Sequence, residues 1–177
     1  MTDALMESGG WRSSRWWFLV KASPVAWLLC AMVVGLTGRF QLSLDVQTRQ
    51  CLPGHRFFVI DRSVHARDLR RGDILVYLAD EQTPLEPRGA RIAKVVIGLP
   101  GDHVRVAAER TEVNGVVVGY GLLLADKAGT TPAALERELV VPPGHVWAMG
   151  ATVDAYDSRY YGPVSLAKME GKAWGLL

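Results

Sequence analysis

The hydrophobic positions of this chain form one long run near the start and many short runs after it. The long run, "WWFLVKASPVAWLLCAMVVGLTG", covers residues 16–38 and holds one charged side chain, Lys21, near its N-terminal end. A helix of about 20 mostly apolar residues can cross a bilayer, and a lysine close to one end can reach the headgroups. No A-x-A cleavage signal follows the run. The pattern predicts an uncleaved transmembrane signal anchor over 16–38, with a buried core helix as the alternative.

From residue 40 onward the apolar runs are short, rich in β-branched residues and separated by Gly, Pro and Asp. Such runs predict strands, here over residues 57–61, 73–79, 90–99, 103–108, 111–118, 137–142 and 145–150. Asn114-Gly115 predicts a two-residue hairpin turn, because both of its positions need a positive φ. Residues 120–138 read as an insertion with at most one short helix, near 133–138. The predicted fold class is mainly β, an antiparallel domain over 39–177 on an N-terminal transmembrane helix.

The charge distribution is mixed along the chain. The net charge is +2, without a Lys/Arg run or a basic stripe that would indicate nucleic-acid binding. Arg12 and Arg15 precede the long run and Lys21 lies near its N-terminal end, against Arg39 and Arg49 beyond it. This excess favours residues 1–15 in the cytoplasm and residues 39–177 on the other side of the membrane.

Cys51 is the first candidate for chemistry. The chain has two cysteines, which cannot form a disulfide framework, and Cys30 lies within the apolar run. Cys51 instead opens the turn "CLPG", just past the predicted helix. It is either a small buried filler or a nucleophile, since a thiol is already a few per cent thiolate at neutral pH.

Lys94 is the second candidate, within the apolar stretch "RIAKVVIGLPGDHV". Strand alternation places it on the same face as Ile92 and Val96. The more common arrangement for such a lysine is a solvent-facing one on a half-exposed strand. The alternative is a desolvated site, where loss of water disfavours the ammonium form and makes the amine available as a general base.

A third stretch, Asp157-Ser158-Arg159 in "DSRYYGPV", places an acid and a guanidinium side by side. One interpretation is an ordinary surface turn with an ion pair that contributes less than about 1 kcal/mol. The other is a buried brace that holds the wall of a site.

Taken together, these stretches resemble the signal peptidase I superfamily, and most of all its TraF-type branch of conjugative-transfer peptidases. The resemblance covers residues 45–165 and includes "CLPG", "RRGDILVY", "RIAKVVIGLPGDHV", "VPPGHVWAMG" and "DSRYYGPV". It implies a β-rich domain with a shallow substrate groove, and cleavage after small residues by a serine and a lysine. It also implies that some members join the ends of a pilin precursor into a circle.

The sequence departs from the family pattern at the nucleophile, because Cys51 occupies the place of the catalytic serine. Arg49 stands where many members have a serine that helps to bind the oxyanion, and a backbone N–H at Cys51 could serve instead. The family's glycine-aspartate-asparagine loop is reduced to Gly150, Ala151 and Thr152. Ala155 replaces a serine found near the lysine, which leaves the orientation of Lys94 to other groups, with Asp157 as a candidate.

Other chemistries find little support in the sequence. The histidines lack a papain-like signature, although a Cys51–His mechanism stays open as a minor alternative; they are His55, His65, His103 and His145. No metal-ligand spacing and no dinucleotide motif occurs, so no metal or cofactor is expected.

The sequence therefore predicts a signal-peptidase-like protease with a Cys51–Lys94 dyad, supported by Asp157, Ser158 and Arg159. Its expected place is the bacterial inner membrane, with the catalytic domain in the periplasm. Its expected partners are membrane lipid and a precursor polypeptide, most plausibly a conjugative pilin, with no nucleic acid. The alternative is a catalytically inactive bitopic scaffold of a conjugative type IV secretion system.

Overall fold

The computed structural model describes residues 10–45, 51–52 and 54–176, with side chains from residue 23 onward. The chain divides into two units, residues 1–39 and 40–177. The first unit contains one helix, α1 (Gly10–Arg39), which runs through Pro24. Large apolar side chains of α1 are exposed, namely Val25, Trp27, Leu28, Leu29, Met32, Val33, Val34 and Leu36.

The helix expected over residues 16–38 is thus present within α1. Its predicted role as a membrane span is not confirmed, because no helix in the described part of the chain combines the length and the hydropathy that a crossing requires. The finding concerns the described residues alone.

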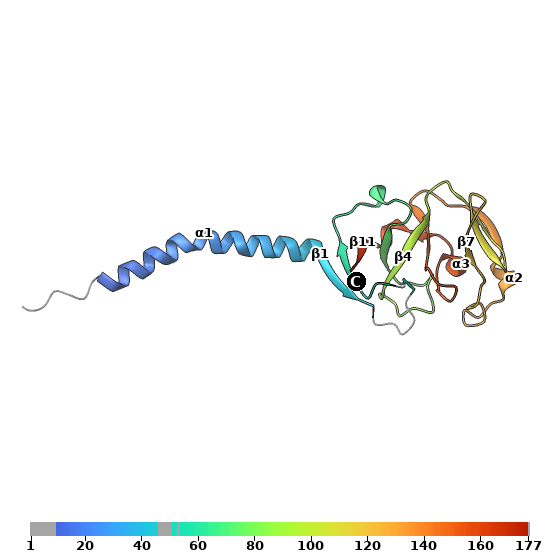
Figure 1. Cartoon of the computed structure of the whole chain (residues 1–177), viewed down its shortest axis with the longest axis horizontal. Helices are drawn as coiled ribbons and strands as arrows, with labels where there is room; N and C mark the ends of the chain where they lie inside the picture. The colour runs from blue at the N-terminus through green and yellow to red at the C-terminus, as the bar shows by residue number, and fades with distance from the viewer. Residues whose placement is uncertain (1–9, 46–50, 53, 177) are drawn as a thin grey trace, which may run out of the picture. The chain divides into compact units, whose positions relative to one another are not determined.

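The second unit is built on two antiparallel sheets (Figure 1). The larger has the strand order β1-β2-β11-β3-β4-β9-β10. Its strands are β1 (Phe40–Leu44), β2 (Phe57–Asp61), β3 (Ile74–Leu78), β4 (Arg91–Gly98), β9 (His145–Met149), β10 (Val164–Ser165) and β11 (Met169–Leu176). The smaller has the order β7-β6-β5-β8, with β5 (His103–Val106), β6 (Arg110–Val113), β7 (Val116–Tyr120) and β8 (Arg137–Val140).

Four short helical segments connect these strands: η1 (Ala66–Asp68), α2 (Pro132–Leu135), α3 (Ser158–Tyr161) and η2 (Leu166–Lys168). The helix expected near residues 133–138 is α2, which ends earlier because β8 begins at Arg137. The Asn114-Gly115 turn is confirmed, with φ of 52° and 78°. The mainly β, antiparallel prediction is therefore confirmed for the second unit.

Every predicted strand is present, and the run at 111–118 forms the β6–β7 hairpin. The sequence analysis missed β1, β10 and β11. The last of these matters most, because β11 lies between β2 and β3 and pairs with both.

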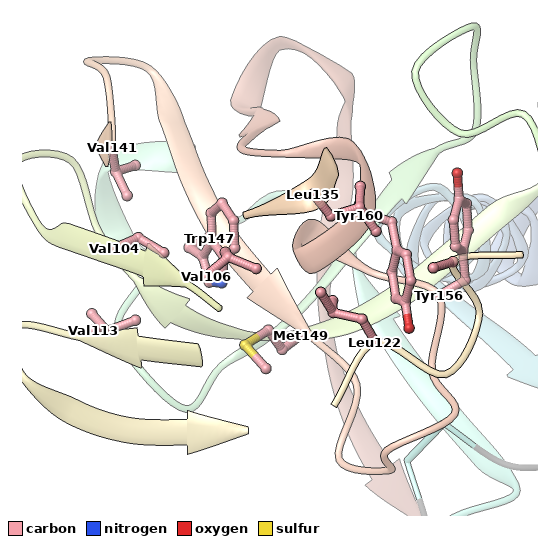
Figure 2. Packing of buried hydrophobic residues seen from close by; sticks show 11 residues of the cluster. Val104, Val106, Val113, Leu122, Leu135, Val141, Trp147, Met149, Tyr156 and Tyr160 are labelled. Carbon is pink, nitrogen blue, oxygen red and sulfur yellow. The ribbon is translucent and has the colours of Figure 1, made fainter. Parts of the chain in front are cut away.

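The core between the two sheets is apolar. Figure 2 shows Val104, Val106 and Val113 of the smaller sheet facing Trp147 and Met149 of β9. Leu122 and Leu135 from the predicted insertion belong to the same cluster, so that segment is folded onto the core. A second cluster under β3 and β4 contains Leu75, Tyr77, Ile92 and Val96. This cluster covers the face of β4 that also carries Lys94.

Candidate active site

Cys51 and Lys94, more than 40 residues apart in the sequence, line the same pocket. The pocket has a volume of about 170 Å³. It is lined by Ser43, Leu44, Asp45, Cys51, Leu52, Phe58, Glu86, Arg91, Ile92, Ala93 and Lys94. A liquid water molecule occupies about 30 Å³, so the pocket suits small side chains.

Lys94 is positioned by β4, where its backbone faces Leu75 of β3. The burial pattern of β4 alternates, and Ile92, Lys94 and Val96 share the buried face. Lys94 is 3 % exposed. The more common solvent-facing arrangement weighed from the sequence is therefore wrong here, because the cluster beneath β3 and β4 covers this face.

The amine of Lys94 lacks the partners that a buried charge usually has. It makes no hydrogen bond or ion pair with any other residue that the structure describes. Apolar side chains from Leu52, Phe58 and Ile92 line the pocket beside it. Polar and charged side chains line the same pocket.

Cys51 is half-buried, and the loop after β9 holds its backbone. The amide of Ala151 donates a hydrogen bond to the carbonyl of Cys51 at 2.8 Å. Gly150 permits this approach, since a Cβ there would collide with Ala155 and lie 3.5 Å from both the Cβ and the carbonyl oxygen of Cys51. The next residue, Leu52, is buried among Phe58, Ile60, Val76 and Ala173, and this packing holds the chain directly after Cys51. Arg49, which bears on the oxyanion prediction, lies outside the described residues.

Asp157, Ser158 and Arg159 form a buried brace behind this loop. They are 0 %, 0 % and 1 % exposed, so the interpretation as an ordinary surface turn does not hold. Arg159 donates to the Asp157 carboxylate from Nε at 2.9 Å and from Nη2 at 2.8 Å. The same carboxylate accepts from the Gly150 amide at 3.0 Å, and the Ser158 hydroxyl accepts from the Ala148 amide at 3.0 Å. The brace therefore fixes β9 and the loop that holds Cys51.

The Arg159 guanidinium also donates hydrogen bonds to four backbone carbonyls. Its Nη1 donates to Tyr120 and Gly121, at 3.1 and 3.3 Å, and its Nη2 donates to Thr152 and Ala155, both at 3.2 Å. Burial would lower the pKa of Arg159, but its hydrogen bond and ion pair with Asp157 outweigh burial and hold that pKa above its ordinary value. The guanidinium is a structural cation.

Arg137 of β8 is a supporting residue that sequence reasoning missed. It donates from Nη2 to the carbonyls of Ser158 and Arg159, both at 2.9 Å. Its guanidinium also lies over the Trp147 ring, 5.7 Å from the centroid. Burial lowers the pKa of Arg137. The smaller sheet thus holds the brace from the side opposite the pocket.

Two tyrosine hydroxyls meet on the buried side of β3. Those of Tyr77 and Tyr161 are 2.5 Å apart. Tyr77 faces Ile92 on β4, two positions along the strand from Lys94. Burial raises the pKa of Tyr77 well above its ordinary value, and the hydrogen bond with Tyr161 opposes part of that increase. Asp157, Glu86 and Cys51 add to the rise through their charge, so Tyr77 lies within the electrostatic reach of the site.

The structure also shows which predicted contacts are absent. Within the described chain, the Asp157 carboxylate accepts from the Gly150 amide and from the amide and guanidinium of Arg159, and Lys94 is not among its partners. His55 packs against Gly175 and Phe58 instead of lining the pocket. His65, His103 and His145 do not line it either. The Cys51–His alternative therefore has no geometric support.

Comparison with known proteins then identifies the family. The profile described as "Signal peptidase, peptidase S26" matches residues 16–176, nearly the whole chain. The chain belongs to this family. Signal peptidase homologues of this superfamily are proteases that act on precursor polypeptides.

Individual relatives agree with this assignment. The chain is 30% identical over 120 residues to "Probable signal peptidase I-2" of Synechocystis sp., covering 67% of this chain and 53% of the relative. It is 29% identical over 161 residues to "Signal peptidase I" of Bacillus caldolyticus, covering 82% and 85%. It is 32% identical over 84 residues to "Conjugal transfer protein TraF" of Agrobacterium fabrum, covering 48% and 47%. The chain spans about half the length of the first relatives it matches.

Proposed function

We propose that this protein is a signal-peptidase-like endopeptidase in which Cys51 is the nucleophile and Lys94 the general base. One observation carries the proposal: both residues line one small pocket, and Lys94, 3% exposed, has no hydrogen bond or ion pair with another described residue. A nucleophile and an unpaired amine in one pocket are the groups that acyl transfer without histidine requires.

The acylation step follows from these two groups. The neutral amine of Lys94 accepts the thiol proton as Sγ attacks the carbonyl carbon of the scissile peptide bond. The tetrahedral intermediate then collapses, its C–N bond breaks, and the Lys94 ammonium returns the proton to the leaving amine. The product is a thioester on Cys51, with the C-terminal part of the precursor released.

Deacylation needs a second nucleophile that Lys94 can activate in the same way. Water attacking the thioester carbonyl releases a carboxylate and regenerates the thiol. An amine attacking the same carbon forms a new peptide bond, and this gives a circle if the amine belongs to the same chain. The backbone N–H of Cys51 is the proposed donor to the oxyanion in both steps.

The substrate is proposed to be a secreted precursor, and specifically a pilin subunit of a conjugative system. The likeness to the conjugal transfer protein supports this choice, together with the order of the motifs. A pocket of about 170 Å³ fits the small residues that precede the cleaved bond. The precursor would bind as an extended strand, in the manner of β-addition.

The proposed location is the bacterial inner membrane, with residues 40–177 in the periplasm. The exposed apolar side chains of α1 support association of that helix with lipid. The excess of positive charge before the helix supports a cytoplasmic N-terminus.

The competing proposal is an inactive scaffold of the secretion apparatus, supported by the departures at Cys51 and Ala155. The environment of Lys94 argues against it. Burial of an amine without a partner is costly, and a scaffold gains nothing from it that an apolar residue would not give.

Processing assays with four variants test the proposal. A synthetic precursor peptide with Ala-x-Ala before the scissile bond is incubated with wild type, Cys51→Ala, Cys51→Ser and Lys94→Ala, and the products are weighed by mass spectrometry. Loss of cleavage in Cys51→Ala and Lys94→Ala is expected. A product one water lighter than the linear peptide reveals cyclisation.

Two controls are matched to these variants. Cys30→Ser removes the other thiol, and Lys127→Ala removes an exposed amine outside the pocket. Both are expected to cleave like wild type. If Cys51→Ala and Lys94→Ala also cleave like wild type, the dyad is wrong and the scaffold proposal takes its place.

A further inference from the structure

A second and larger hollow opens on the other side of Cys51. Its volume is about 390 Å³, and its lining is mainly apolar, with Val95, Ile97, Val117, Val118 and Met149 among the residues that form it. The proposed chemistry does not use this hollow.

The second hollow is lined in part by residues that contact the Cys51 backbone. Gly150 and Ala151 line the second hollow, and these are the residues that hold Cys51 by the 2.8 Å hydrogen bond and the close approach described above. Cys51 itself lines the first pocket. The nucleophile therefore stands at the boundary between the two.

Strand β4 runs beneath both hollows. Ala93 lines the first pocket, whereas Val95 and Ile97 line the second, and all three lie on the half-buried face of the strand. Successive residues on one face of a strand are about 7 Å apart. An extended chain bound along β4 would therefore place alternate side chains in the two hollows.

The second hollow offers apolar surface and no available charge. Val117 and Val153 at its rim are 38% and 51% exposed. Arg159 is the charged residue of its lining, and that guanidinium already donates to Asp157 and to four carbonyls. At Gly119 the lining comes close to Met149, because a Cβ there would lie 2.5 Å from the Met149 methyl group. The hollow is thus suited to an apolar side chain and not to an anion.

We propose that this second hollow binds a large apolar side chain of the precursor on the leaving side of the scissile bond. The inference rests on the proposed function. The smaller pocket takes the residue that precedes the bond. The residue sharing that side of an extended chain is the second one after the bond, so a leucine, methionine or phenylalanine is preferred there.

Peptide pairs test this preference. Two peptides identical except for Leu or Ala at the second position after the scissile bond are cleaved by wild type, and the ratio of their kcat/KM values is measured. A ratio of roughly ten is expected from burial of most of one leucine side chain. In Val117→Asp and in Val153→Asp the ratio is expected to fall towards one.

Val116→Asp is the matched control. Val116 neighbours Val117 on β7, is 64% exposed and does not line the hollow, so this variant is expected to keep the wild-type ratio. Val153 belongs to a loop, which keeps the test valid if a charge on β7 impairs folding; thermal melts of each variant check this.

A binding measurement separates the preference from catalysis. In the Cys51→Ala background, fluorescence polarisation of the labelled Leu peptide is expected to show weaker binding after Val153→Asp. A wild-type ratio of one, or a ratio unchanged by both Asp variants, overturns the inference while the dyad stands. Cleavage of both peptides by Cys51→Ala at the wild-type rate refutes the dyad instead.

Discussion

Lys94 and Arg159 are the two buried basic residues in the described part of this domain, and their surroundings differ. Arg159, 1% exposed, donates to both oxygens of Asp157 and to the carbonyls of four other residues. Lys94, 3% exposed, has no such partner in the described part of the chain. The two residues are embedded to the same degree, so burial alone does not distinguish a structural charge from a reactive one.

The two side chains differ in how many of their hydrogen-bond donors have partners. A planar guanidinium with all its donors engaged stays charged and holds several chain segments together. An amine without such partners, in the same pocket as a thiol, is free to take part in proton transfer. The pairing of buried groups is therefore the more informative observation, and it supports stability as the role of Arg159 and reactivity as the proposed role of Lys94.

Lys94→Met is expected to have the largest effect on activity, and it tests the proposed reactive role of Lys94. Loss of the proposed general base is expected to lower kcat by about 10²- to 10⁴-fold. The free energy of unfolding should stay the same or rise, because an apolar side chain of similar length suits the site better than an unpaired amine. Peptide cleavage and urea unfolding of the same sample measure both effects. A destabilised Lys94→Met protein would show that the amine has a structural partner after all.

Arg159→Met is expected to lower the stability of the domain instead, because it removes a structural charge. It leaves the Asp157 carboxylate buried without its counter-charge, and the free energy of unfolding is expected to fall by about 3–5 kcal/mol. Denaturant unfolding provides the measurement. The double variant Asp157→Asn/Arg159→Met should recover part of the loss, because no buried charge remains. Equal losses in the single and double variants would mean that packing, and not pairing, explains the effect.

Asp102 is a third paired charge, and its pairing is expected to stabilise the fold less than that of Arg159, because its partner Arg71 is 44% exposed. Burial would raise the pKa of Asp102, but hydrogen bonds from Arg71, the Leu99 amide and Asn114 outweigh it and hold that pKa below its ordinary value. The unfolded chain therefore takes up this proton first as the pH falls, and the stabilisation present near neutral pH is lost in acid.

The expected result is a loss of about 1–2 kcal/mol in Asp102→Asn at pH 7. The difference from wild type should shrink as the pH falls below about 4, where the aspartate of the unfolded chain is protonated. Thermal or urea unfolding of both proteins across pH 3–7 measures this difference in the free energy of unfolding. A difference that stays constant over this range would exclude the ionised carboxylate as its source.

Alternating or continuous apolar runs made most of the strands predictable. The runs at 57–61 and 90–99 gave β2 and β4 almost to the residue, and the turn at Asn114-Gly115 gave the β6–β7 hairpin. Alternation placed Lys94 on the same face as Ile92 and Val96, but whether that face was covered depended on residues distant in sequence. Burial of this kind is a tertiary property that a single strand does not encode.

The strand β11 escaped prediction for a physical reason. Its buried positions are Gly171 and Ala173, and a Cβ on Gly171 would lie 2.5 Å from the carbonyl oxygen of Asp61. Close approach of β2 requires small residues there, and small residues carry little hydrophobic signal. Likewise Glu86 and Arg91 of the pocket and Arg137 of the brace are charged residues whose roles arise only when distant segments meet.

The position of β11 also has a consequence for biosynthesis. Strands β2 and β3 do not pair with each other, and both pair with β11, the last strand that the structure describes. A nascent chain that has emerged only through β10 therefore holds a β1–β2 hairpin and a separate β3–β4–β9–β10 group. The strand that unites Ser43 on β1 with Lys94 on β4 in a single sheet arrives last from the ribosome. The proposed active site, on this view, is complete only when synthesis of the domain is complete.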